Sequence, residues 1–190
     1  MKALLCNLSD WFYEKSKNNL ALLLLLVVFL SFQAFLFSYI IKLYGLQEHV
    51  ILDLKFGFNP EFAFEVISGY CERGRQGIMV LTGIVDMIYP LIYGSLLVLL
   101  ISRFRGKVNS GSNTNQTINL LPVVAVFFDF LENTGILIMI NYYPEQVIPI
   151  AWIASFAGMF KWVFLGISVI ILLIYLIKAL HNWNSRVSGN

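Results

Sequence analysis

The chain has 190 residues, of which 58% are apolar and 13% charged, and its mean hydropathy is +0.76. Soluble domains average roughly 45–50% apolar and about 25% charged residues. The composition therefore excludes an ordinary soluble domain and indicates a membrane protein, and a net charge of only +2 gives no reason to expect a nucleic-acid partner.

The N-terminal part of the chain predicts an interfacial segment followed by a first span. In residues 1–19, apolar residues recur three and four apart among charged ones, which predicts a short helix in the membrane interface. A frayed tail is the alternative. Residues 20–44 are the first predicted span, because Ala21 to Ile41 carries no charge. A cleavable signal peptide is the competing interpretation, but its apolar region usually has only about 7–15 residues.

A polar connection at residues 45–77 separates the first span from the second. Asn59, Pro60 and Glu61 have the order of an N-cap, a first-turn proline and a first-turn acid, so we expect an amphipathic helix at about residues 60–72. An acidic stripe follows its helical spacing, at Glu61, Glu65, Ser68 and Glu72. Such a helix could cover the mouth of a bundle as a lid, or lie in the interface with a solvated acidic face.

Three further apolar runs predict spans at residues 78–102, 120–141 and 150–180. Pro90 removes a backbone donor inside the second span and predicts a kink there. The connections are a loop at 103–119, whose Gly/Ser/Asn-rich part, 108–119, we expect to be mobile, and a short turn at 142–149; a tail follows at 181–190. Four spans with mostly short connections predict an all-α, polytopic membrane protein built as an up-down four-helix bundle.

An even number of spans places both termini on one side of the membrane. Their side, with the 103–119 loop, carries eight Lys and Arg residues against two acids, whereas the other side carries four against six. The positive-inside rule therefore predicts an integral membrane protein with both termini cytoplasmic, and we expect it in a bacterial inner membrane. Cys6 and Cys71 fall on opposite sides, so we expect no disulfide.

Polar residues inside the third span form the most unusual feature of the sequence. Asp129, Glu132 and Asn133 lie within the apolar run from Leu120 to Ile140, at i, i+3 and i+4. This spacing puts all three on one side of a helix. A charged group at the bilayer centre costs at least about 2.5–3.5 kcal/mol, so such residues usually face a protein interior and have partners there.

The second and fourth spans carry polar residues at a similar predicted depth. Asp86 shares one side of the second span with Tyr89 and Tyr93, and Lys161 lies well inside the fourth apolar run. Lys161 can neutralise one acid, which leaves a surplus that needs protons, water or a cationic ligand. The candidate ligand- or ion-binding residues are therefore Asp86, Tyr89, Tyr93, Asp129, Glu132, Asn133 and Lys161. The alternative is an interhelical clasp that only fixes the helix register.

Metal and cofactor chemistry have no sequence signal here. Neither histidine lies within a predicted span, which removes the usual intramembrane metal ligand. No phosphate-binding glycine motif and no nucleophile–base pair is apparent. We therefore expect no cofactor and no metal, and assign no catalytic residue.

A resemblance rests on motifs in residues 65–165. They are Gly74-Arg75, Asp86, Pro90-Leu91, Tyr93-Gly94, Asp129, Glu132-Asn133, Tyr143-Pro144 and Lys161-Trp162. This order resembles a group of small, four-span bacterial membrane proteins to which no activity is assigned. The resemblance supports the site but implies no function, and the first span and the tail carry no motif of it.

Three functions are compatible with this pattern. The first is a protein that binds or moves a proton, a cation or a small amphipathic ligand at the acid, lysine and tyrosine residues of the last three spans. The second is an accessory subunit, in an oligomer or beside a partner membrane subunit, whose polar layer is a clasp. The third is an intramembrane enzyme that acts on a lipid with two carboxylates as acid and base. Membrane lipids are the expected surroundings in each case.

Overall fold

The computed structural model describes residues 2–46, 51–108 and 117–187. These residues form helices and turns without a strand. Four segments are long and apolar enough to cross a membrane: Asn19–Tyr44, Glu72–Val108, Ile118–Tyr142 and Ile148–Asn182. The protein is thus an all-α, polytopic helical bundle, as the sequence predicts. Most of the predicted mobile loop falls on residues 109–116, which lie outside the described residues.

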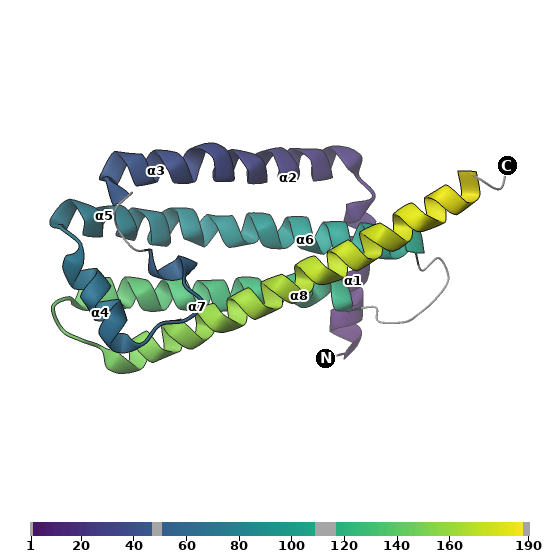
Figure 1. Cartoon of the computed structure of the whole chain (residues 1–190). Coiled ribbons are helices and arrows are strands. Elements are labelled where there is room, and N and C mark those ends of the chain that lie inside the picture. The colour runs from purple at the N-terminus through teal and green to yellow at the C-terminus, as the bar shows by residue number, and fades with distance from the viewer. Residues whose placement is uncertain (1, 47–50, 109–116, 188–190) are drawn as a thin grey trace.

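The spans lie side by side, and the fourth crosses the others obliquely (Figure 1). The first span consists of α2 (Asn19–Ser31), the π-helical turn η1 (Phe32–Leu36) and α3 (Phe37–Tyr44). The third is α7 (Leu121–Tyr142), entered through η5 (Ile118–Leu120). Both termini lie at one end of the bundle (Figure 1), which we call the α1 end; the opposite end is the α4 end.

The second and fourth spans are longer than a bilayer requires. The second runs through α5 (Glu72–Val80), the π-helical turn η4 (Leu81–Val85) and α6 (Asp86–Val108). The fourth is the single helix α8 (Ile148–Val187), whose last turns extend past the bundle at the α1 end (Figure 1). At about 1.5 Å per residue, about 20 residues cross a bilayer, so both helices have turns to spare beyond one crossing.

Close packing of α7 against α8 depends on small residues. Ala151, Ala154 and Ala157 recur every third position of α8 and are buried. A Cβ added at Gly135 of α7 would come within 2.7 Å of the Ala154 Cβ, so only glycine permits this approach. Small residues of this kind let membrane helices pack with their backbones close together, which brings the polar side chains of α7 and α8 within reach of one another.

The first connection folds onto the α4 end of the bundle. Asn59 caps α4 (Pro60–Gly69) by accepting a hydrogen bond from the Phe62 amide at 2.8 Å, as the sequence predicts. The predicted end of this helix at about residue 72 is wrong. Tyr70 takes an extended conformation and ends the helix, so Glu72 belongs to α5.

The α4 helix uses its two faces differently. Ala63, Phe64 and Ile67 are buried against the bundle, whereas Glu61 and Glu65 are exposed. The acidic stripe is therefore a solvated face. The connection before α4 contains the short 3-10 turn η3 (Leu52–Leu54), which contacts α7 and, through Asp53, Lys161 of α8.

At the α1 end, α1 (Lys2–Ser16) lies across the bundle and is held by hydrogen bonds (Figure 1). The buried Asn119 side chain accepts from Ser9 Oγ at 2.7 Å and donates to Ser102 Oγ at 2.7 Å. Arg103 donates to the Ser16 carbonyl at 3.0 Å. These contacts tie α1 to the second and third spans. Cys6 in α1 and Cys71 near the opposite end are both free.

Candidate functional site

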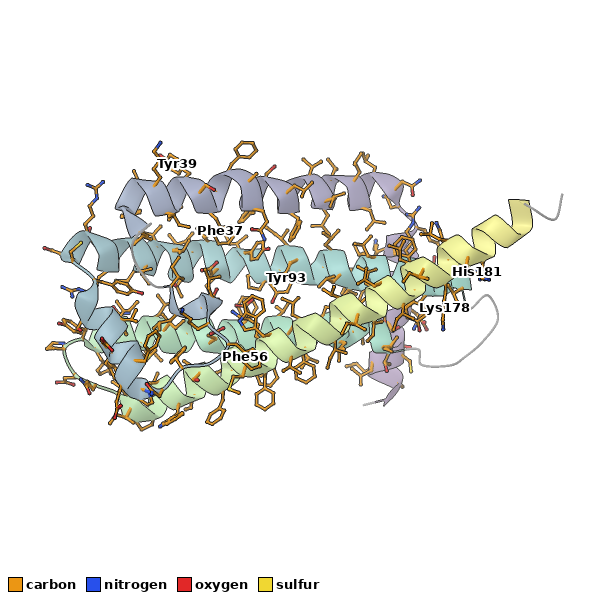
Figure 2. The ribbon with its side chains drawn as sticks, in the orientation of Figure 1. Phe37, Tyr39, Phe56, Tyr93, Lys178 and His181 are labelled. Carbon is orange, nitrogen blue, oxygen red and sulfur yellow. The ribbon has the colours of Figure 1, made fainter. Side chains whose placement is uncertain are left out.

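A cavity of about 560 Å³ lies among the first, second and fourth spans and η3. Most of its wall is apolar, and its polar groups come from five elements of the fold. The polar lining residues are Gln33, Asp53, Asp86, Tyr89, Tyr93, Asp129, Lys161 and Trp162. Side chains of the first and second spans reach into the space between them, among them Phe37 and Tyr93, whereas Tyr39 points away from the bundle (Figure 2).

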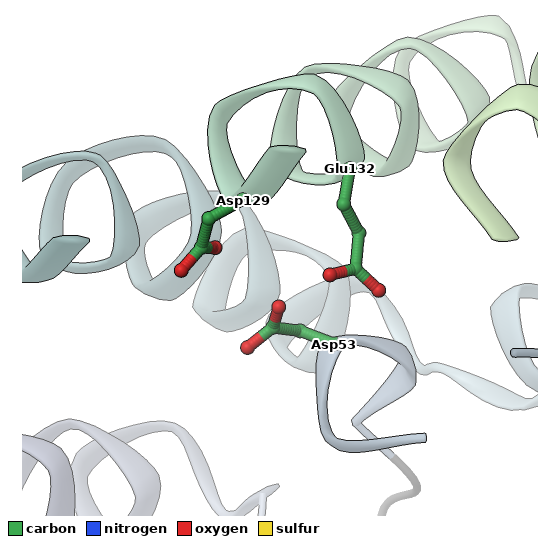
Figure 3. A group of neighbouring side chains, drawn as sticks. All are labelled: Asp53, Asp129 and Glu132. Carbon is green, nitrogen blue, oxygen red and sulfur yellow. The ribbon is translucent and has the colours of Figure 1, made fainter. Parts of the chain in front are cut away.

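Lys161 is the centre of a buried ion-pair cluster. Its Nζ lies 2.6 Å from Glu132 Oε2 and 3.8 Å from Asp129 Oδ1. It also forms an ion pair with Asp53 and donates to the Asp53 backbone carbonyl at 3.1 Å. The three carboxylates converge from η3 and α7 (Figure 3). Gly158 makes room for this cluster, because a Cβ there would overlap the Glu132 carboxylate.

The same three carboxylates are close enough to share a metal ion, since one oxygen from each lies within 4.8 Å of the others. However, the Lys161 ammonium already contacts all three of them. A cation therefore occupies the position between them, and it belongs to the protein. We assign Asp53, Asp129, Glu132 and Lys161 to an ion-pair cluster that ties η3 to α7 and α8.

A second group of contacts joins α6 to α7. Pro90 has no amide hydrogen, so the carbonyl of Asp86, four residues before it, loses its helical donor. Asn133 Nδ2 donates to this carbonyl at 2.9 Å and to Asp129 Oδ1 at 3.0 Å. Tyr93 donates to the other oxygen of Asp129 at 2.7 Å. Asn133 thus satisfies the backbone at the proline and orients Asp129 at the cavity wall.

The side chain of Asp86 differs from the other acids in having no such partner. It is 5% exposed and lines the cavity. Within the described part of the chain, its carboxylate forms no hydrogen bond or ion pair. It follows directly after η4, and π-helical turns of this kind are frequent at functional sites. Asp86 is therefore the acid that is free to contact a ligand.

Aromatic rings surround the same part of the cavity. The Tyr89 ring lies 5.0 Å from Phe37, 5.4 Å from Tyr93 and 5.9 Å from Phe29, centroid to centroid. The Tyr89 hydroxyl accepts a hydrogen bond from Gln33 in η1. The two π-helical turns therefore contribute to neighbouring parts of one wall, because η1 carries Gln33 and η4 leads into Asp86.

The mouth of the cavity faces the side of the bundle. Three of its lining residues are exposed: Gln33 in the first span, Leu54 in η3 at 64% and Val169 in α8 at 40%. They mark an opening between the first and fourth spans. These two spans pack mainly on other helices, the first on α6 and the fourth on α7 and α6.

The structure brings the predicted site residues together but divides them by role. Five of them line the cavity: Asp86, Tyr89, Tyr93, Asp129 and Lys161. Glu132 and Asn133 lie behind this wall as partners of Lys161, Asp129 and the Asp86 backbone. The predicted site residues all belong to the last three spans, and residues of the first span and of the first connection line the cavity beside them.

Sequence reasoning missed Asp53, Gln33 and Trp162. Gln33 had a signal, because it is the one amide in the uncharged run of the first span. Asp53 had no such signal, because it is one of six Asp, Glu and Lys residues in the polar connection between Gly45 and Arg73. Trp162 stands next to Lys161 and lines the cavity, with its indole Nε1 buried.

Comparison of the chain with family models, with curated proteins and with solved structures finds no match. The class of protein is nevertheless defined by the fold: a four-span helical membrane protein with a buried cluster of carboxylates and one lysine. Its function must be argued from the site itself.

Proposed function

We propose that the protein binds a small amphipathic molecule, taken from the surrounding lipid, in the cavity between its first, second and fourth spans. The observation that carries this proposal is the cavity itself, with a volume of about 560 Å³, apolar walls and a few converging polar groups. Ligand sites typically have about 300–1,000 Å³ and this mixture of a mainly apolar lining with few polar groups. A lateral mouth between the first and fourth spans suits a ligand that partitions into the bilayer.

Mass spectrometry of the intact protein tests this proposal. Protein extracted in a gentle neutral detergent should retain a discrete small mass. Leu97 lines the cavity and Leu91 on the same helix is 54% exposed outside it, so Leu97→Trp should lose the bound mass and Leu91→Trp should keep it. If wild-type protein and both variants carry the same adducts, or none, the cavity is not a ligand site.

A structural function for the ion-pair cluster is supported by its geometry. Lys161 joins Asp53, Glu132 and Asp129 from different elements, as a clasp would. This clasp fixes η3, which forms part of the cavity wall. The clasp interpretation therefore applies to Lys161 and its three acids, and the ligand interpretation applies to Asp86 and the aromatic residues near it. An oligomer, a partner subunit, and movement of a proton or cation across the membrane stay predictions.

We propose further that the α1 end faces the cytoplasm, on the charge asymmetry of the sequence. The two free cysteines allow a direct test, because Cys6 lies in α1 and the exposed Cys71 begins α5 at the other end. A membrane-impermeant maleimide should label Cys71, but not Cys6, in intact cells. Cys6→Ser and Cys71→Ser variants identify which thiol reacts, and labelling of Cys6 alone would reverse the topology.

A further inference from the structure

The charges around the cavity are unequal. Asp53, Asp86, Asp129 and Glu132 provide four carboxylates, whereas Lys161 is the one basic residue among the lining and cluster residues that the structure describes. Lys161 is already engaged by three of these acids, and Asp129 also accepts from Tyr93 and Asn133. Asp86 is left 95% buried without a hydrogen bond or ion pair to any described residue. A buried carboxylate without a hydrogen bond or an ion pair is stabilised by a positively charged ligand beside it.

The aromatic rings beside Asp86 favour the same charge. Aromatic faces carry negative potential and attract ammonium groups that approach within about 6 Å of the ring centre. Tyr89 and Tyr93 follow Asp86 on α6 by about one and two helical turns, the Tyr89 ring lies close to those of Phe29 and Phe37, and all four rings line the cavity. An anionic head would meet these faces and the three carboxylates that line the cavity, so the wall disfavours it.

The cavity has polar and apolar parts that are separated along α6. Asp86, Tyr89 and Tyr93 come first and Leu96 and Leu97 follow toward the α1 end, and Leu165 of α8 also lines the cavity. From Asp86 to Leu97 the helix advances about 16 Å, at about 1.5 Å per residue. This length accommodates an alkyl chain whose head lies at Asp86.

We infer that the ligand is an amphipathic amine, with an ammonium head at Asp86 among the rings of Phe37, Tyr89 and Tyr93 and an apolar chain along Leu96 and Leu97. This inference rests on the proposed function, because it names the chemical class of the molecule that the cavity binds. Asp86 supplies the countercharge, and Lys161 remains in its own cluster.

A set of probes with the same chain and different heads tests the inference. Purified protein in neutral detergent is incubated with dodecyltrimethylammonium, dodecylamine, dodecanol or dodecanoate, and the retained adduct is measured by mass spectrometry of the intact protein. Wild-type protein should retain the two ammonium probes at least about ten-fold more tightly than dodecanol or dodecanoate, since a buried charge partner contributes on that scale or above.

Variants then assign the preference to the proposed residues. Asp86→Asn should abolish the preference for ammonium heads and leave dodecanol retention unchanged, because the amide keeps the shape and removes the charge. Asp10→Asn, at an exposed position of α1, is the matched control and should change nothing. Phe37→Leu should weaken retention of the ammonium probes by about two- to thirty-fold, which keeps the test usable if Asp86→Asn does not fold.

The outcomes separate this inference from the proposed function. Equal retention of all four probes, lost in Leu97→Trp, would refute the amine head and leave the cavity a ligand site. Preference for dodecanoate would also refute it and would point to Lys161 as the anchor. If no probe is retained by folded wild-type protein, the proposed function itself fails.

Discussion

The contact between Asn133 and the backbone at Pro90 gives the most specific prediction about stability. Asn133→Leu keeps the approximate volume of the side chain but removes its donor to the Asp86 carbonyl. That carbonyl then has no partner, because Pro90 cannot supply the helical amide hydrogen. Pro90→Ala restores an amide hydrogen at this position, so it should reduce the cost of Asn133→Leu.

The magnitude of this coupling follows from one hydrogen bond to the Asp86 carbonyl, which Asn133 donates and Pro90 cannot. Hydrogen bonds between membrane helices contribute about 0.6 kcal/mol on average and up to about 1.7 kcal/mol, and a buried unsatisfied group costs about 1–3 kcal/mol. We expect Asn133→Leu to cost about 1–3 kcal/mol alone, and about 1 kcal/mol less in the Pro90→Ala background. The remaining cost is the lost donor to Asp129.

Unfolding by sodium dodecyl sulfate in mixed micelles, followed by far-ultraviolet circular dichroism, measures the four free energies of this double-mutant cycle. Pro122→Ala is the control, because Pro122 lies at the start of α7, where a proline displaces no helical hydrogen bond. It should be additive with Asn133→Leu. If Pro90→Ala is equally additive, Asn133 does not compensate for the proline and the reasoning is refuted.

Three further changes test the clasp and the α1 end. Lys161→Met should lower the free energy of unfolding by about 3–5 kcal/mol, because it leaves buried carboxylates without their countercharge. Adding Glu132→Gln should recover part of this loss in the same assay. If Lys161→Met leaves the free energy of unfolding unchanged, the cluster is ruled out. Gly158→Ala should cost about 1–3 kcal/mol by displacing the Glu132 carboxylate, whereas Gly166→Ala, with open space around it, should cost nothing in thermal melts. Asn119→Leu should loosen α1 on the bundle and speed amide hydrogen exchange in α1, and unchanged exchange would contradict the role given to this side chain.

The bundle could be predicted because span lengths are set by local composition. A run of about 20 apolar residues satisfies its backbone hydrogen bonds only as a helix in lipid, whatever the rest of the chain does. The start of α4 is equally local, since the Asn59 cap and Pro60 act within one helical turn. The end of α4 could not be predicted in this way, because nothing in the spacing from Glu61 to Glu72 indicates that Tyr70 is extended.

Asp53 shows why part of the site could not be predicted. Its position depends on how a connection folds back between the spans, where the Phe58 amide donates to Ser155 Oγ at 2.8 Å. Gly57 has a φ of 77°, and a Cβ there would come within 2.9 Å of Met159, so the turn needs glycine. These contacts join residues about 100 positions apart in the chain, and no periodicity in the sequence reports them.

The π-helical turns were missed for a different reason. Helical periodicity predicts which side of a span a residue faces, and one wider turn shifts this relation for every residue beyond it. Asp86 follows such a turn directly. Its grouping with Asp129 and Lys161 could be predicted from residue counts, whereas its freedom from the Lys161 cluster could not.

The most direct test of the account measures whether an amphipathic ammonium enters the cavity beside Trp162. A protein that keeps Trp162 as its one tryptophan, with the other three changed to Phe, is titrated with dodecyltrimethylammonium brominated on its chain, which quenches nearby indole fluorescence. The account predicts quenching that saturates at a low probe fraction and is reversed by unbrominated probe. The matched protein that keeps Trp152, which is 45% exposed, should instead be quenched in proportion to probe. If Trp162 is also quenched in simple proportion, or not at all, the cavity does not bind the proposed ligand.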